Sequence, residues 1–351
     1  MKNIGIDIGK KKCFICVMDE KGSIMEETDY DNTMQDAESF AKNMNKKYRR
    51  CRAVCESTGN MWIKTYESFE KNGIPIKLAN PLKNKAIAEA SIKTDKIDAR
   101  TLAHLLRTDL VVQCHVPTWK TRDQKQILRH RENMVQDRTK IANRMNNLLD
   151  KYDLQTIGNH ITGVKNLQWL SEQKLPMTHD DYIMHQCIRQ IRQLNCDIKQ
   201  LEKTIDKIAL QNEDAKIIMS MTGFDSFGAL IALEIDGISR FPTPKKLVSW
   251  MGMCPTVHQS GNSIYHGKMK KDSNRRVNWM MTQAANVASF KDERMREVYQ
   301  RARKKHPHGV AVSHVANKMG TIIWHLLDKK TLYNQRKDAL YARKLKRIKS
   351  Q

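Results

Sequence analysis

This 351-residue sequence has no long apolar run and no regular pattern of cysteines, and its acidic residues are few compared with its basic ones. No segment reaches the roughly 20 uninterrupted apolar residues that a membrane-spanning helix needs, and the N-terminus lacks the layout of a signal peptide. The eight cysteines follow no regular spacing, which argues against a disulfide framework and favours a reducing compartment. We therefore expect a soluble cytoplasmic protein with no membrane partner.

Cys13 and Cys16 form a CxxC pair, a spacing that zinc sites often use. Both lie in an apolar run that predicts a strand, where residues three apart face opposite sides of the sheet. We therefore expect buried thiols at these positions and not a zinc site.

Basic residues greatly outnumber acidic ones. Lysine and arginine total 62 against 38 for aspartate and glutamate, which gives a net charge of +24. A protein with such a charge most often binds nucleic acid, which is a polyanion. A ribosomal or histone-like role would also need this charge, but a 40% hydrophobic content with periodic segments indicates a globular protein.

Four of the acidic residues occupy positions typical of a metal-dependent nuclease. Asp7 lies in the apolar run IGIDIG, and Glu56 ends the apolar run AVCE. Asp95 and Asp98 are three residues apart at the start of a helical stretch, so both face the same way. Clustered carboxylates repel one another unless a hard cation such as Mg²⁺ neutralises them. These four residues are the predicted Mg²⁺ ligands, for chemistry on phosphodiesters.

Each acidic position also has an alternative interpretation. An Asp-x-Gly after a strand opens the phosphate loop of sugar kinases and actin-like ATPases, but the nearest candidate for the second loop of that fold, at Asp236, lies in a helical, basic context. Glu56 alone would be an ordinary carboxylate at the end of a strand. Asp95 and Asp98 could simply favour the helix dipole. The basic residues beside them could offset the carboxylates or bind nucleic-acid phosphates; these are Lys93, Lys96 and Arg100.

Residues 1–112 predict an α/β domain. Strands are expected over 3–8, 13–18, 23–28, 52–56 and 74–78, and helices over 34–45, 61–72 and 96–106, with a hairpin turn at 19–22. This order matches the ribonuclease H-like topology. The first and fourth strands are neighbours in that fold, so Asp7 and Glu56 should lie together.

Residues 113–211 predict a long helical coiled-coil arm. Apolar pairs recur every seven residues from Ile127 to Leu149, and steps of four and three link Cys187 to Ile208. A loop over about 153–178 separates the two stripes. We expect two antiparallel helices, either within one chain or shared between subunits as a dimerisation arm.

Residues 212–351 predict a mainly helical domain. Residues 221–235 suggest a helix-hairpin-helix, which presents backbone N–H groups to DNA phosphates. A polar segment with Ser260 follows, and His258 and His266 are the nearby histidines. Trp279, Met280, Met281 and Trp324 are expected in the core, and the last seventeen residues form a basic tail. Further predicted nucleic-acid contacts are Lys268, Lys270, Lys271, Arg275 and Arg276.

The whole chain resembles the insertion-sequence 110 family of transposases, which includes the Piv-type DNA invertases. The similarity rests on GIDIGK at 5–10, ESTG at 56–59, KTDKIDA at 93–99, Asn80-Pro81, TGF at 222–224, Glu234-Ile235, Arg240-Phe241, WMGMCP at 250–255 and QSG at 259–261. The last motif aligns Ser260 with the family's serine, and Ser263 is the alternative. The loop at 267–276 follows the family pattern loosely, with Ser273 where glycine is usual.

The resemblance implies a RuvC-like domain with a DEDD metal site, joined to a domain with a serine nucleophile. It implies a covalent phosphoserine intermediate, target and donor DNA as substrates, and a structured bridge RNA as guide. It also implies a homo-oligomer, a dimer or dimer of dimers, whose active sites combine domains of different subunits. The protein would be prokaryotic and bound to the nucleoid when on DNA.

Three alternatives stay open. A RuvC-like junction-resolving nuclease would use water as nucleophile and leave Ser260 idle. A Piv-type invertase would use no RNA guide. A non-catalytic architectural protein would need only the basic surface, so that Glu56→Gln would leave its function unchanged.

Overall fold

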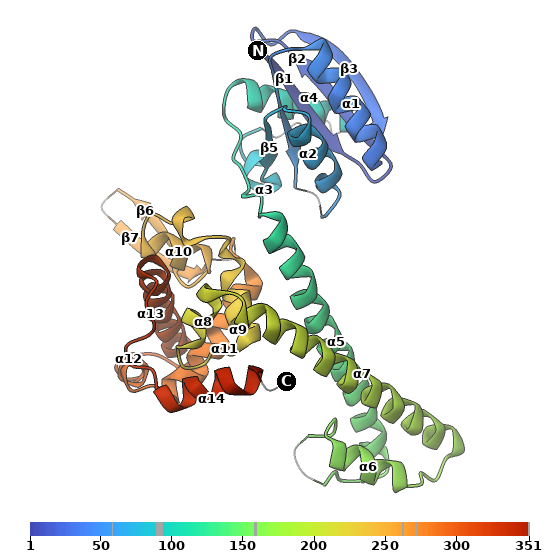
Figure 1. Cartoon of the computed structure of the whole chain (residues 1–351), viewed down its shortest axis with the longest axis vertical. Coiled ribbons are helices and arrows are strands. Elements are labelled where there is room, and N and C mark those ends of the chain that lie inside the picture. The colour runs from blue at the N-terminus through green and yellow to red at the C-terminus, as the bar shows by residue number, and fades with distance from the viewer. Residues whose placement is uncertain (58, 89–93, 158–159, 262, 271, 350–351) are drawn as a thin grey trace. The chain divides into compact units, whose positions relative to one another are not determined.

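The computed structural model of the chain describes residues 1–57, 59–88, 94–157, 160–261, 263–270 and 272–349, without the side chains of Ile264 and His266. The described residues divide into two compact units, Met1–Val116 and Pro117–Gln351. Figure 1 shows the helices and strands of both units. Among the described residues, no helix is both long and apolar enough to cross a membrane.

The N-terminal unit is built on a sheet with the order β3-β2-β1-β4-β5. Its strands are β1 (Lys2–Ile8), β2 (Lys12–Met18), β3 (Ile24–Asp31), β4 (Cys51–Glu56) and β5 (Ile76–Ala79). The first three strands are antiparallel neighbours, whereas β4 pairs parallel with both β1 and β5. This is the ribonuclease H-like order that the sequence predicts. β3 runs three residues further than expected because its polar end pairs with β2 at the sheet edge.

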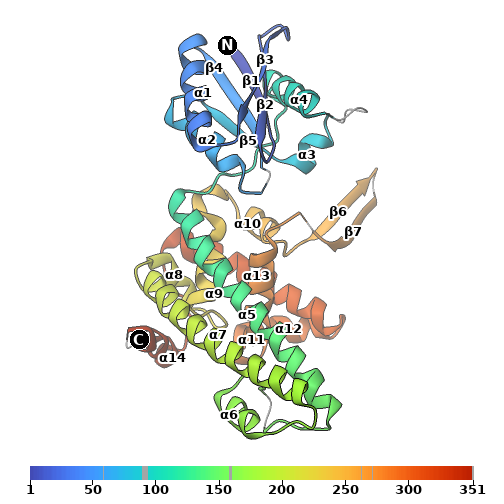
Figure 2. The same ribbon diagram turned by 90° about the vertical axis from the view of Figure 1, so that its right-hand side faces the viewer.

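Helices cover both faces of this sheet. The helices are α1 (Met34–Lys47), α2 (Trp62–Lys71), the short α3 (Pro81–Lys85) and α4 (Asp95–Arg107). Figure 2 shows α1 and α2 on one side of the sheet and α4 on the other. Residues of β1 alternate accordingly: Ile4, Ile6 and Ile8 pack in the core under α1 and α2. Cys13 and Cys16 are buried in two different clusters, so the two thiols do face opposite sides of the sheet.

The second unit begins with two long helices, α5 (Trp119–Lys151) and α7 (Thr178–Leu210). They are antiparallel, because Arg131 contacts Glu202, Arg138 contacts Asn195 and Lys151 contacts Asp180. The connection between them is not the plain loop that the sequence suggests. It contains α6 (Val164–Glu172), whose Leu167 and Leu170 pack between the two long helices. The apolar pattern around these leucines covers too few residues to predict a helix.

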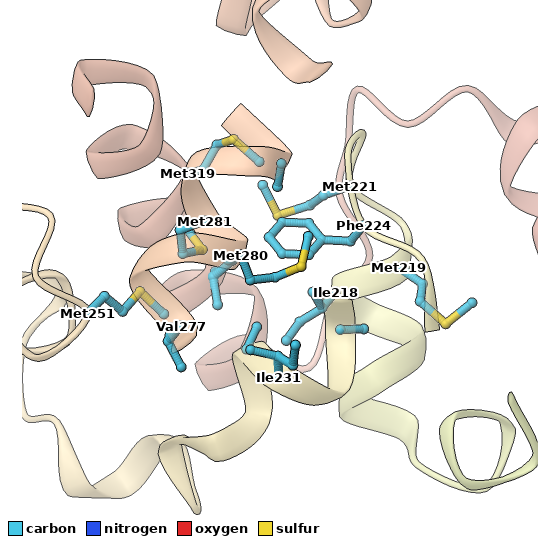
Figure 3. Close-up of a cluster of buried hydrophobic side chains, with 14 of the residues drawn as sticks. Ile218, Met219, Met221, Phe224, Ile231, Met251, Val277, Met280, Met281 and Met319 are labelled. Carbon is cyan, nitrogen blue, oxygen red and sulfur yellow. The ribbon is translucent and has the colours of Figure 1, made fainter. Parts of the chain in front are cut away.

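The rest of the second unit is mainly helical. It comprises α8 (Glu213–Met219), α9 (Ser226–Ala232), η1 (Leu233–Ile235), η2 (Ile238–Arg240), α10 (Pro244–Trp250), β6 (Pro255–Ser260), β7 (Ser263–Met269), α11 (Arg275–Lys291), α12 (Glu293–Arg303), α13 (His308–Lys329) and α14 (Asp338–Lys349). Methionines are frequent in its core, where Met221, Met280 and Met319 surround Phe224 (Figure 3). Their flexible side chains fill irregular gaps between helices.

The expected core residues of α11 and α13 are mostly buried, with one correction. Met280 and Met281 are in the core, and Trp324 packs against it. Trp279 is 47% exposed instead. The buried positions of α11 continue at Ala284, Ala285 and Ala288, and residue 279 falls on the opposite side of that helical stripe.

Candidate functional site

Asp7 and Glu56 lie side by side on neighbouring parallel strands. The register pairs Ile6 of β1 with Cys55 of β4, so Asp7 and Glu56 are next in line. Neighbouring strands are about 4.8 Å apart. The predicted adjacency of the first and fourth strands is therefore confirmed.

Both carboxylates also belong to the face of the sheet that α4 covers. Residues two apart in a strand share a face, so Asp7 shares a face with Gly5, and Glu56 with Val54. Gly5 lies directly under α4, where an added Cβ would come within 2.1 Å of the Ala99 carbonyl oxygen. Val54 packs in the cluster that the α4 leucines form.

The direction of α4 brings its first turn toward the same end of the sheet. At the far end of α4, the Leu106 carbonyl accepts a hydrogen bond from the Arg52 guanidinium, which also donates to the Asn3 side chain. The end of the helix thus lies over the beginning of β1, and the middle lies over Gly5. The first turn, with Asp95 and Asp98, follows toward Asp7. The Thr94 hydroxyl caps this turn by accepting from the Ile97 N–H at 3.3 Å.

Asp7 and Glu56 therefore share one face and one end of the sheet, and the first turn of α4 is directed toward that end. Oxygen donors of this kind suit a hard divalent cation. Among the described residues, however, no group of three or more His, Cys, Asp or Glu side chains is close enough together to hold a metal ion. The fold supplies suitable donors in one neighbourhood, and Mg²⁺ binding stays a prediction.

The predicted basic residues around α4 fall into different environments. Arg100 donates from Nη2 to Glu27 at 2.7 Å and from Nε to the same carboxylate, which attaches α4 to β3. These hydrogen bonds lower the pKa of Glu27 and raise that of Arg100. Lys96 is exposed, and Lys93 lies outside the described residues. Nucleic-acid binding by these three residues stays a prediction.

Ser260 lies at the tip of the β6–β7 hairpin. It is the last residue of β6, pairs across the hairpin with Ser263, and is exposed. Gly261 follows with φ +54°, a left-handed conformation that glycine adopts without strain. The hydroxyl groups of both candidate serines therefore belong to an open turn.

A histidine shares this face of the hairpin with Ser260. His258 is two residues earlier in β6 and pairs with Tyr265 of β7, with ring centroids 6.4 Å apart. The side chain of His266, the other histidine considered from the sequence, lies outside the described residues. The imidazole of His258 therefore lies on the same strand as Ser260 and on the same face of the hairpin.

The predicted basic residues after the hairpin differ in their exposure. Lys268 and Arg275 are exposed, whereas Lys270 lies nearer the body of the domain, with Nζ 3.4 Å from the Ser249 hydroxyl. Lys271 lies outside the described residues. Binding of nucleic acid by these side chains is untested.

Arg276 belongs to a network of charged residues that sequence reasoning missed. Its guanidinium binds Glu132 of α5, at 2.9 Å and 3.0 Å, and also Glu234 of η1. Glu234 is only 2% exposed and also accepts from the Asn274 amide at 3.2 Å, with Lys125 at 3.9 Å. Burial lowers the pKa of Lys125. Two acidic and two basic side chains balance here, and the network fixes the start of α11 to α5 and η1.

The turn between α8 and α9 is covered by the C-terminal helix. Lys344 of α14 donates to the carbonyl oxygens of Met219, Met221 and Phe224 at 2.9, 3.2 and 2.8 Å. Burial lowers the pKa of Lys344 to about 8. Part of the predicted basic tail is therefore packed on the domain. The helix-hairpin-helix interpretation of α8 and α9 stays a prediction.

Comparison with known proteins identifies two domains. The DEDD transposase domain of the IS110 group matches residues 4–153, which contain all four carboxylates. The domain of the transposase IS116/IS110/IS902 family matches residues 215–300, which contain Ser260.

The chain is also similar to known transposases and, over part of its length, to a solved structure. The chain is 24% identical to the transposase for insertion sequence element IS1111A of Coxiella burnetii, over 95% of this chain and 91% of that protein. It is 23% identical to the putative transposase y4pF/y4sB of Sinorhizobium fredii, over 78% and 71% of the two chains. The Thermus thermophilus RuvC structure aligns with 32% of this chain and 100% of its own, at 12% identity and a TM-score of 0.26. The chain belongs to the IS110 family of transposases, enzymes that cleave DNA and transfer its strands.

Proposed function

We propose that the chain cuts and rejoins DNA through a covalent bond to Ser260, with a divalent metal ion, most simply Mg²⁺, held by Asp7, Glu56, Asp95 and Asp98. The observation that carries this proposal is the pairing of β1 with β4, which puts Asp7 beside Glu56 on the face of the sheet that α4 covers, with the first turn of α4 directed toward them. An exposed serine at a hairpin tip, within the second family domain, adds a nucleophile that a large substrate can reach.

In the proposed reaction, the Ser260 Oγ forms a bond to the phosphorus of a DNA phosphodiester. The bond to the 3′ oxygen breaks, which leaves a free 3′-hydroxyl and a phosphoserine joined to the 5′ end. In the second step, a 3′-hydroxyl of another strand attacks the phosphoserine and releases Ser260. One phosphoester bond replaces another in each step, so no nucleotide cofactor is consumed.

The residues of the chain prepare this attack. A serine hydroxyl is a weak nucleophile and must lose its proton as it reacts. His258 lies on the same strand and face and is a suitable acceptor for that proton. A bound divalent cation would supply stabilisation of the negative charge on the reacting phosphate. The carboxylates would hold that cation, and the exposed Lys268 and Arg275 would offset DNA charge.

The carboxylates and the serine belong to different units of the chain. We propose that the complete site combines the N-terminal unit of one subunit with the second unit of another, in a dimer or a dimer of dimers. The arm supports this assembly, because Leu194 and Leu201 in the middle of its apolar stripe are only partly buried. A second subunit would cover them, in a coiled-coil contact of the kind that the heptad pattern predicts.

We further propose that a structured bridge RNA selects the target and donor DNA. The support for RNA is the family resemblance and the net charge of +24, which exceeds what a small DNA contact needs. The α8–α9 turn, as a helix-hairpin-helix, would contact the DNA backbone, and the protein would associate with the nucleoid when bound. A Piv-type invertase without RNA is the second candidate within the same family.

A protein–DNA trapping experiment tests the proposal. The purified protein is incubated with Mg²⁺, element-end DNA and RNA from the flanking region, and products are separated on a denaturing gel. We expect an adduct whose peptide mass maps to Ser260, and its loss in both Ser260→Ala and Glu56→Gln. Omitting the RNA separates the guided enzyme from the Piv-type alternative.

Ser263→Ala is the matched control, because Ser263 pairs with Ser260 across the same turn. It should leave the adduct in place. An adduct that maps to Ser263 would transfer the nucleophile to that residue. Nicked DNA with no adduct would replace the serine mechanism with a RuvC-like nuclease that uses water.

A further inference from the structure

The corner between α12 and α13 carries positive charge that the proposed reaction does not use. From Val298 to Leu327 the sequence has no aspartate or glutamate, but it has five lysines and arginines and four histidines. Such a stretch is unusual even in this basic chain, where acidic residues are about 11% of the whole (38 of 351).

A cavity of about 380 Å³ lies at this corner. Arg301 and Lys305 reach it from the end of α12, Lys318 and His314 from α13, and His306 from the turn between the helices. The imidazole rings of His306 and His314 are stacked, with centroids 5.5 Å apart and an angle of 21° between planes. The lining therefore offers five nitrogen-bearing side chains and no carboxylate.

Three cationic side chains of this corner have no acidic partner in the part of the chain that the structure describes. Among the described residues, no carboxylate lies within 4.0 Å of the charged groups of Arg301, Lys305 or Lys318. Glu297, one turn before Arg301, offers it a backbone carbonyl at 3.4 Å and not its carboxylate. Like charges that share a cavity repel one another, and an anion bound between them relieves that repulsion.

Aromatic rings occur on the same helices and at the end of α11. Phe290 at the end of α11 is 58% exposed, and its ring centroid is 5.7 Å from that of Tyr299 on α12. The Tyr299 hydroxyl in turn lies 2.9 Å from Nδ1 of His308. Exposed rings beside cationic side chains are typical of nucleic-acid surfaces, because bases stack on the rings while phosphates meet the cations.

We propose that this corner, defined by Arg301, Lys305, His306, His314 and Lys318, binds the phosphodiester backbone of a nucleic acid. The inference rests on the proposed function only in its partner, because the corner would act in binding and not in bond breaking. It gives the second unit a contact with the polynucleotide that is separate from the hairpin carrying Ser260. Duplex DNA and RNA share this backbone chemistry, and the experiment distinguishes them.

The test is the salt dependence of binding, measured in EDTA so that no cleavage occurs. Each phosphate contact contributes about 0.9 to the slope of log K against log salt for duplex DNA, and about 0.7 for a single strand. We expect the triple variant Arg301→Gln, Lys305→Gln, Lys318→Gln to lower the slope by about 2.7 on a duplex, or about 2.1 on single-stranded RNA. On a duplex, wild type would lose about 40-fold more affinity than the variant between 50 and 200 mM salt.

The control removes the same charge at lysines that already face a carboxylate: Lys42→Gln, Lys71→Gln, Lys140→Gln. Its slope should match wild type, and unfolding curves should show that both variants are folded. An equal slope change in both variants, or none in the triple variant, would overturn the inference. Wild type that binds neither polynucleotide would overturn the proposed function itself, so the two failures are distinct.

Discussion

Replacing Gly5 with alanine tests how α4 positions Asp95 and Asp98. The new Cβ would lie 2.1 Å from the Ala99 carbonyl oxygen and 2.4 Å from the Ala103 nitrogen, where ordinary contact begins at 3.4 Å. Strand and helix must therefore separate by about 1.3 Å, the difference between 3.4 and 2.1 Å. Both clashing atoms belong to the backbone, so no side-chain rotation can relieve the contact.

The cost of this separation follows from what α4 buries. Leu102, Leu105 and Leu106 are each at most 5% exposed against the sheet. Overpacking a core usually costs about 1–3 kcal/mol, and we expect a value near the top, about 3 kcal/mol. A displacement of about 1 Å in a catalytic group can also lower the rate about 100-fold. Gly5→Ala should therefore lose most strand transfer even while it remains folded.

Hydrogen exchange of peptides from residues 1–116 would measure the stability of this unit separately from the other. Strand transfer would be assayed on the same preparation. Gly309→Ala is the stability control, because nothing lies within 4 Å of its Cβ position at the start of α13. It should be neutral or stabilising by up to about 1 kcal/mol. Unchanged exchange in α4 together with full strand transfer in Gly5→Ala would refute the close packing argued here.

Three further predictions concern the second unit. Gly223→Ala should destabilise it by about 2–4 kcal/mol in urea unfolding, because Gly223 has φ +97° and its Cβ would lie 2.5 Å from the Ala284 carbonyl oxygen; an unchanged midpoint would contradict this. Glu234→Ala should cost about 3–5 kcal/mol by leaving Arg276 without one of its buried partners, whereas Glu234→Gln should cost less in the same thermal unfolding assay. The pKa of Lys344 is about 8 in the folded chain against 10.5 for an ordinary lysine; the unfolded chain thus holds more protons between these values, and the free energy of unfolding of wild type should rise from pH 8 to 10 relative to Lys344→Met. A difference between the two proteins that does not change with pH would show that Lys344 titrates normally.

Local sequence patterns predicted most of the N-terminal unit. Short apolar runs indicated β1, β2 and β4, and the helical stretch that begins with Asp95 and Asp98 indicated α4. The order of these elements then implied that β1 and β4 are neighbours, which placed Asp7 beside Glu56. That inference succeeded because each pattern spans only a few residues. Apolar side chains are buried in the same way whatever the fold, so such a pattern predicts its element without knowledge of the rest of the chain.

Other features depend on residues far apart in the chain. Nothing in the sequence indicated that Gly5 packs against the backbone of Ala99. The heptads predicted the pairing of α5 and α7 but not α6 between them, and Trp279 was expected in the core although it is exposed. A short apolar pattern, or a single aromatic residue, does not predict which other part of the chain will pack against it.

The sequence by itself determined most of the elements, the family and the pairing of the two strands that carry Asp7 and Glu56, because strand and helix periodicity is a local property and the order of elements limits their pairing. Only the tertiary structure showed that Arg276 is bound between Glu132 and Glu234, and that Lys344 returns to the α8–α9 turn. Arg276 and Glu132 are 144 residues apart. In a sequence this rich in lysine and arginine, the sequence does not show which basic residue pairs with which acid. The packing of the helices that carry these residues decides the partner of each one.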